Sequence, residues 1–252
     1  MAVIPIEIIS DVICPWCYIG YRTLQRTIAL YKKTYPGGSN DEFRIVWKPY
    51  FIDLVEPEGS VLIYGKRSHV SYIYYVCLET EEVNPTMRSI DRMARRMTAA
   101  QIDAAQTRIK REGRAVGIDF QFGGSMGSSR LAHRALYFAI SSETGGSEIQ
   151  CRLAENLFRA QFELEKDVSH PDVAVESAVN AGLDEDNVKA FLEGGCGVKE
   201  VEIEQREVRE MGVQGVPLFK IGEESLDGAA GMEEFFEAFV KARGRGSVAG
   251  IA

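Results

Sequence analysis

The chain of 252 residues is long enough to bury a hydrophobic core, as one large domain or two small ones. Its 45% hydrophobic and 26% charged residues are typical of a folded globular protein and exclude a wholly disordered chain. The formal net charge of −8 argues against nucleic acid as the main partner, because binding phosphates needs concentrated positive charge. No stretch reaches the roughly 18 apolar residues of a membrane-spanning helix, so we expect no membrane insertion.

The first part of the chain predicts a strand, a helix and a second strand. Residues 3–10 are rich in β-branched side chains and suit a buried strand. From 18 to 35 the apolar residues recur at near-helical spacing, and a turn rich in Gly and Pro follows at 36–40. Residues 43–52 are again typical of a strand. The pair Cys14 and Cys17 therefore lies where the first strand enters the helix.

The middle of the chain, residues 56–196, is predicted to be mostly helical. Thr98 and Gln101 have the spacing of a capping box at the start of one helix, and Ser128 or Ser129 could cap the next. Glycines are expected to end several of these helices. The predicted helices span residues 97–116, 128–142, 148–164, 171–181 and 184–192.

Residues 61–90 differ in composition from the segments on either side. They contain an aromatic run at 72–75 and show no clear helical or strand period. We interpret this atypical segment as a lineage insertion or a translated intron.

Strand signals return near the C-terminus. A charged amphipathic helix is predicted at 198–211, two short strands at 218–221 and 225–226, and a last helix at 231–242. The pattern is α/β: a βαβ part (1–55), an inserted helical domain (56–196), an αββα part (197–243) and a flexible Gly-rich tail (244–252).

The cysteine content points to a reducing compartment. There are five cysteines, an odd number, and Cys77, Cys151 and Cys196 are isolated from the close pair. A secreted protein held by structural disulfides more often has an even, denser set. The N-terminal segment has no basic region, and Glu7 interrupts its apolar run, so it does not resemble a signal peptide. We therefore expect a cytoplasmic protein.

The placement of Cys14 and Cys17 predicts redox chemistry. The first turn of a helix has free N–H groups and the positive end of the helix dipole, which stabilise a thiolate. A spacing of two residues brings the second thiol close enough to form a disulfide, and Pro15 suits the first helical turn. We expect Cys14 to be the nucleophile and Cys17 the resolving thiol.

A Cys-x-x-Cys pair can instead be half of a zinc site or a structural pair. Zinc needs two further ligands at suitable spacing, and the three histidines are scattered, so we predict no metal site. A second element, Val216-Pro217, precedes a short strand. We expect its peptide bond to be cis and the backbone of Val216 to pair with an extended peptide; an ordinary trans turn is the alternative.

Several motifs together resemble the DsbA-like family, in its FrnE-type branch. The N-terminal motif from Ser10 to Gly20 reads Ser-Asp-Val-Ile-Cys-Pro-Trp-Cys-Tyr-Ile-Gly. The other motifs are Trp47-Lys48-Pro49-Tyr50, Ala132-His133-Arg134, Leu157-Phe158-Arg159-Ala160 and Gly212-Val213-Gln214-Gly215-Val216-Pro217. The resemblance extends over about residues 3–60 and 97–240.

The resemblance implies a thioredoxin-like fold with an inserted all-helical domain. It implies disulfide exchange with protein or small thiol substrates, without a metal or organic cofactor, with Pro217 as a cis-proline beside the thiols. Pro15 and Trp16 would tune the reduction potential of the pair. Asp11 could influence thiol protonation, with a surface or capping role as the alternative, and we expect His133 to be structural.

A related branch, with kappa-class glutathione transferases and 2-hydroxychromene-2-carboxylate isomerases, typically has serine at the first motif position. A glutathione-dependent transferase or isomerase is therefore the alternative function, and a non-catalytic binding module is a third. Glutathione stays a candidate substrate or reductant. The sequence leaves the oligomeric state open, with a homodimer among the alternatives.

Overall fold

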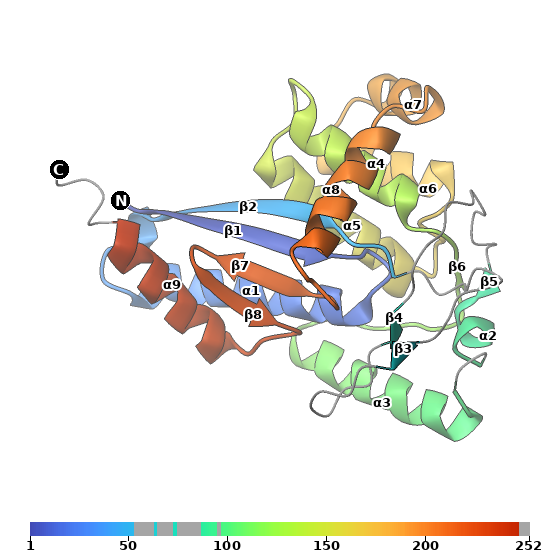
Figure 1. Cartoon of the computed structure of the whole chain (residues 1–252), viewed down its shortest axis with the longest axis horizontal. Coiled ribbons are helices and arrows are strands. Elements are labelled where there is room, and N and C mark those ends of the chain that lie inside the picture. Colours follow the sequence, from blue (N-terminus) through green and yellow to red (C-terminus); the bar gives the residue numbers. More distant parts are fainter. Residues whose placement is uncertain (53–62, 65–72, 75–86, 95–96, 247–252) are drawn as a thin grey trace.

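The computed structural model describes residues 1–52, 63–64, 73–74, 87–94 and 97–246. At its centre is a four-stranded sheet in the order β2-β1-β7-β8 (Figure 1). Strand β1 is parallel to β2 and antiparallel to β7, and β7 is antiparallel to β8. The strands span β1 Val3–Ser10, β2 Glu42–Pro49, β7 Leu218–Ile221 and β8 Glu224–Asp227. The predicted strands are confirmed, although β2 ends at Pro49 rather than near residue 52.

The burial pattern of β1 explains its central position in the sheet. Ile4, Ile6 and Ile8 alternate with exposed residues and enter the main core. Ile9 points to the other face, where it packs with Val208 and Leu218 in a separate small cluster. The end of β1 nearest the cysteines is therefore buried on both faces.

Helices cover the sheet from both sides. Helix α1 (Pro15–Thr34) follows β1 and packs against α9 (Met232–Gly246), which also contacts β1, whereas α5 (Ser147–Phe162) and α8 (Val198–Glu210) pack against β2. Figure 1 shows α9 along the sheet and α4 to α8 gathered at its other side. The expected flexible tail is partly wrong, because residues 244–246 belong to α9; residues 247–252 lie outside the described part.

The inserted segment is rich in helices, as predicted. Thr98 and Gln101 form the expected reciprocal capping box at the start of α3. Helix α4 begins after Ser129, whose side chain makes no capping hydrogen bond; the N–H of Arg130 bonds to Ser128 instead. The helices are α2 Ser89–Ala94, α3 Ala99–Ala115, α4 Arg130–Ser141, α6 Pro171–Ala181 and α7 Glu185–Glu193; a short 3₁₀ helix, Gly38–Asn40, lies earlier in the chain.

The insertion is not all-helical. Strand β5 pairs antiparallel with β6, and β3 pairs antiparallel with β4. The β5–β6 pair joins a segment before α2 to a segment after α3. The local spacing of apolar residues does not predict a contact between segments so far apart in the chain. These short strands are β3 Ile63–Tyr64, β4 Ile73–Tyr74, β5 Met87–Arg88 and β6 Ser125–Met126. Most of the atypical segment 61–90 lies outside the described residues.

One hydrophobic core joins the sheet to the inserted helices. The ring of Tyr18 on α1 stacks on Phe158 of α5, with 5.1 Å between ring centroids, and its hydroxyl donates a 2.6 Å hydrogen bond to Glu163. Helix α1 is thus held on the side of the insertion as well as against α9. The domain boundaries at residues 55 and 196 stay a prediction. Among the described residues, no helix is long and apolar enough to cross a membrane.

Candidate functional site

Strand register brings Cys14 and Pro217 to the same end of the sheet. Ile9, next to the end of β1, pairs with Leu218, the first residue of β7. Because the two strands are antiparallel, β7 begins where β1 ends. The turn that leads from β1 into α1 therefore lies beside the segment that leads into β7.

Cys14 is the N-cap residue of α1. Its backbone is extended, with φ −97° and ψ 113°, and its carbonyl oxygen accepts hydrogen bonds from the N–H groups of Cys17 and Tyr18. Its own N–H donates to the carbonyl of Asp11, 3.0 Å away, and Pro15 occupies the first helical turn. The first turn has no acidic side chain, so nothing there offsets the positive end of the helix dipole.

Cys17 lies one turn inside the helix and is fully buried. Burial raises the pKa of the Cys17 thiol well above its usual value, and the neighbouring Cys14 sulfur raises it further. The backbone N–H of Asp11 and the side chain of Ser10 oppose this shift without cancelling it. Cys14 is less enclosed, at 5% exposure. The two thiols are thus adjacent but unequal in environment.

The Val216–Pro217 peptide bond is cis, and it faces the first thiol. The Sγ of Cys14 lies 3.8 Å from the carbonyl oxygen of Val216. No hydrogen bond from the Val216 N–H is found within the described part of the chain. Residues 211–218 line an open groove of about 600 Å³ together with β7 and β8. An extended chain in this groove would have a backbone donor available next to the thiols.

Trp16, between the two cysteines, is half-buried and carries an arginine on its ring. The guanidinium carbon of Arg108, on α3, lies 4.9 Å from the ring centroid of Trp16. A second link between the same helices runs from the guanidinium of Arg26 to the carbonyl oxygen of Ala115. Arg108 was not predicted from the sequence, because the helical spacing of residues does not show which side chain of another helix each one contacts.

Asp11 is completely buried, so the surface alternative for this residue is wrong. Its Oδ1 accepts a 3.2 Å hydrogen bond from the N–H of Ile13, and its Oδ2 accepts a 2.6 Å bond from the N–H of Ile52. The carboxylate therefore ties the turn before Cys14 to the chain that leaves β2. These hydrogen bonds hold the backbone turn that positions Cys14 and Cys17.

His133 is buried on α4, at 5% exposure, and its Nε2 lies 3.5 Å from Oδ1 of Asp11. Its ring also packs edge-on against Phe51, with 5.4 Å between centroids. The Nε2 atom makes no hydrogen bond within the described structure. Nothing in the sequence indicated that these two residues meet.

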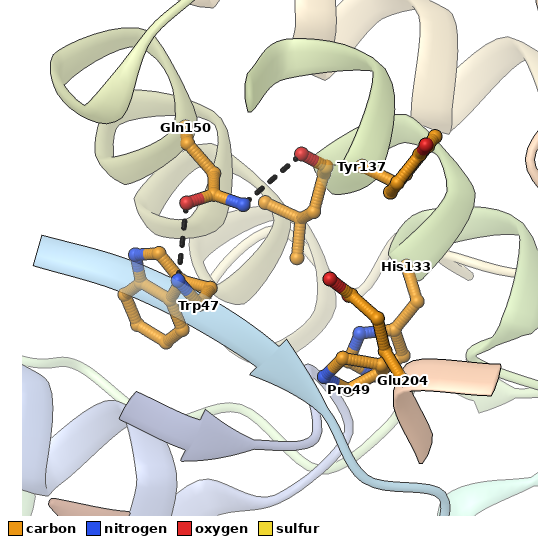
Figure 2. A pocket seen from close by; sticks show the side chains of 7 residues that line it. Trp47, Pro49, His133, Tyr137, Gln150 and Glu204 are labelled. Atoms are coloured by element: carbon orange, nitrogen blue, oxygen red, sulfur yellow. Dashed lines mark hydrogen bonds between the residues drawn. The ribbon is translucent and has the colours of Figure 1, made fainter. Parts of the chain in front are cut away.

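A small cavity borders His133 between β2 and the helices above it (Figure 2). Gln150 crosses it, accepting from the N–H of Trp47 at 3.0 Å and donating to the carbonyl of Leu136 at 3.2 Å. The free volume of about 10 Å³ is near the smallest that holds one water molecule. The cavity is too small for a substrate, whereas the groove beside Val216 is open and far larger.

The cysteines that the structure describes do not assemble into a metal site. Cys14, Cys17, Cys151 and Cys196 are free thiols; Cys151 accepts a hydrogen bond from the indole N–H of Trp47, and Cys196 is exposed. Within the described residues, no group of three or more His, Cys, Asp or Glu side chains could hold a metal ion. Cys77 and His69 lie outside the described residues.

A family model described as the DSBA-like thioredoxin domain matches residues 5–67 and 78–240. The two ranges leave out residues 68–77, which fall inside the atypical segment 61–90. A search of curated proteins gave no match.

Solved structures of similar fold cover almost the whole chain. A probable DsbA oxidoreductase from Streptomyces coelicolor has a TM-score of 0.71 at 24% identity, over 96% of this chain and 90% of that one. A 2-hydroxychromene-2-carboxylate isomerase has a TM-score of 0.58 at 14% identity, over 98% and 99%. A putative protein disulfide isomerase from Nitrosomonas europaea has a TM-score of 0.58 at 13% identity, over 94% and 96%. At these identities the likeness shows a common fold.

The matched family model spans most of the chain, and the solved structures have the same fold. Members of that family are disulfide oxidoreductases. The chain belongs to the DSBA-like thioredoxin domain family and has the thioredoxin-like fold of its members.

Proposed function

We propose that this chain is a thiol–disulfide oxidoreductase that works through Cys14-Pro15-Trp16-Cys17 by mixed-disulfide exchange. The observation that carries the proposal is the position of the Cys14 sulfur at the N-terminus of α1, 3.8 Å from the carbonyl oxygen of Val216. A substrate sulfur that reaches Cys14 would lie beside Val216, whose N–H has no hydrogen-bond partner among the described residues. Cys17, which is buried, would be the second thiol, and it would react only after the mixed disulfide with Cys14 has formed.

In the reducing direction, the Cys14 thiolate attacks a substrate disulfide. A bond forms between Cys14 and one substrate sulfur, the substrate S–S bond breaks, and the other substrate sulfur leaves and takes up a proton. Cys17 then loses its proton and attacks the Cys14 sulfur. The Cys14–Cys17 disulfide forms, the second substrate thiol is released, and two electrons have passed to the substrate. The same steps in reverse oxidise a dithiol.

The residues around the pair would have distinct roles in this reaction. The high pKa of Cys17, raised by burial and by Cys14, keeps it protonated until the mixed disulfide forms, which favours Cys14 as the first nucleophile. Pro15 and Trp16 would tune the potential of the pair. Val216 and Pro217 would bind the substrate backbone. No metal or organic cofactor is needed, and glutathione is a candidate reductant.

The finer assignment is to the FrnE-type branch, in the cytoplasm. The N-terminal motif from Ser10 to Gly20 supports the branch. The odd number of cysteines, three of them isolated in the sequence, supports a reducing compartment. Thiol-trapping of intact cells tests the location, because a cytoplasmic chain should hold Cys196 reduced.

The first experiment is the reduction potential of the Cys14–Cys17 pair in glutathione buffers, with Cys14→Ser as the control. A value of about −120 to −200 mV identifies an oxidase or isomerase, and one of about −270 mV a reductase. The proposal is wrong if no disulfide forms between these residues at any poise. Glutathione-dependent turnover of an electrophile that survives Cys17→Ser would favour the transferase or isomerase alternative.

A further inference from the structure

Arg108 places a positive charge at the edge of the dithiol site. Its guanidinium carbon lies 4.9 Å from the ring centroid of Trp16, and Trp16 stands between Cys14 and Cys17 in the chain. The side chain is exposed, and the tryptophan beneath it is half-buried. Arg108 therefore lies against one of the two residues that separate the thiols in the motif.

Among the described residues, the charge of Arg108 has no ion-pair partner. On the same helix, Arg111 forms a 2.7 Å ion pair with Glu112. Within residues 1–52 and 97–246, by contrast, no carboxylate lies within ion-pair distance of Arg108. The chain has more acidic than basic residues, with a net charge of −8, so acidic side chains are common in it.

An arginine held over a tryptophan ring can still bind anions. The positive charge is attracted to the face of the ring, and the edge of the guanidinium that carries the N–H groups can serve another partner. That edge fits a carboxylate through two parallel hydrogen bonds. The tryptophan also limits the motion of the arginine, so less conformational freedom is lost when a carboxylate binds.

We propose that Arg108 is a specificity-determining residue that selects peptide thiols and disulfides carrying Asp or Glu next to the reactive cysteine. The inference rests on the proposed disulfide exchange and specifies the charge of the preferred substrate. The alternative is that Arg108 only covers Trp16 and holds the motif in place. Such a packing role would affect every substrate equally, because it does not depend on substrate charge.

The test compares three synthetic peptide disulfides that differ only in the residue beside the cysteine: Glu, Gln or Lys. The reaction with each is measured as kcat/KM for the wild type, Arg108→Gln and Arg111→Gln. Arg111→Gln is the matched control, because it removes the same charge from the same helix at a position that is already paired.

We expect the wild type to prefer the Glu peptide over the Gln peptide by about three- to tenfold at low salt, the range of a single well-placed charge contact. Arg108→Gln should reduce that preference to near one, with little change for the Gln peptide, and should raise the rate with the Lys peptide. Arg111→Gln should keep the preference, and about 0.5 M salt should weaken it by screening.

Two results would overturn the inference while leaving the proposed function intact. One is turnover by the wild type with no charge preference. The other is an equal loss on all three peptides in Arg108→Gln, which would assign a packing role. If the wild type turned over none of the peptides, or Cys14→Ser turned them over as well as the wild type, disulfide exchange itself would fail, and this inference with it.

Discussion

Gly20 on α1 faces the ring of Phe219 on β7 so closely that a Cβ at this position would lie 2.9 Å from the Cζ atom of the ring. The same Cβ would be 3.4 Å from Cγ of Pro217. Phe219 is fully buried and packs edge-on against Phe235, so its ring has little room to move. The close approach of α1 to the segment beside the thiols therefore depends on the missing side chain.

Gly20→Ala is expected to destabilise the protein despite the better helix propensity of alanine. Overpacking a core typically costs about 1–3 kcal/mol, whereas Gly to Ala within a helix contributes about 1 kcal/mol. The free energy of unfolding in urea should fall by up to about 2 kcal/mol. Gly244→Ala on α9 is the control: among the described residues, no atom would lie within 4 Å of an added Cβ, so the substitution should be neutral or stabilising. An equal increase in the free energy of unfolding for both variants would contradict the close approach of Gly20 to Phe219.

Cys14 should react with alkylating agents before Cys17. Thiolates are the reactive species, and each unit by which a thiol pKa rises lowers its thiolate fraction about tenfold. Because burial and Cys14 raise the pKa of Cys17, we expect Cys17 to react at least about tenfold more slowly at pH 7. Mass spectrometry of the reduced protein during iodoacetamide treatment measures both rates.

The Cys14→Ser variant separates the two causes of this difference. Burial is the larger cause of the raised Cys17 pKa, so Cys17 should stay slow in the variant and become fast after denaturation. Equal rates of the two thiols in the folded wild type would refute the assignment of Cys14 as the nucleophile.

Asp11→Asn should destabilise the turn before Cys14. The two carboxylate oxygens accept hydrogen bonds from the N–H groups of Ile13 and Ile52. An amide has only one oxygen, so its NH₂ group would lie against one of these N–H donors and leave it without an acceptor. A buried N–H left without a partner costs about 1–3 kcal/mol, which urea unfolding should detect. Asp119→Asn, on an exposed loop, should change the unfolding free energy by less than about 0.5 kcal/mol. Similar effects for the two variants would argue against the bracing role of Asp11.

Asp41 should make stability fall at acid pH. Burial alone would raise its pKa, but hydrogen bonds from the Ala2 N–H at 2.8 Å, Arg243 at 2.6 Å and Tyr31 at 3.1 Å lower it overall. The folded-state pKa thus lies below the unfolded value of about 3.9. The contribution of the carboxylate is complete above that value and is lost as pH falls through the folded-state pKa.

The Asp41→Asn variant tests this pH dependence. The difference in unfolding free energy between wild type and variant should be constant from about pH 7 to pH 5 and shrink below about pH 4. Glu42→Gln removes a neighbouring exposed carboxylate paired with Arg44 and should have a much smaller effect. A difference that stays constant down to pH 2 would show that the carboxylate charge does not matter.

Local sequence signals predicted much of the secondary structure because they act over a few residues. The Thr98 and Gln101 capping box marks the start of α3, and Pro171 opens α6, which Gly182 ends in a left-handed conformation. The same local reasoning extended the flexible tail too far and missed the β5–β6 pair. A strand of two residues has no period of its own, so only its distant partner defines it.

By itself, the sequence determined that Cys14 and Cys17 share the turn where a strand enters a helix, because this depends only on neighbours in the chain. Tertiary structure alone decided what surrounds them. The antiparallel pairing of β7 with β1 places Val216 opposite the Cys14 sulfur, and the packing of α3 against α1 places Arg108 on Trp16. These contacts join residues far apart in the chain. Their geometry is set by the register and packing of whole elements, which no local pattern of residue types records.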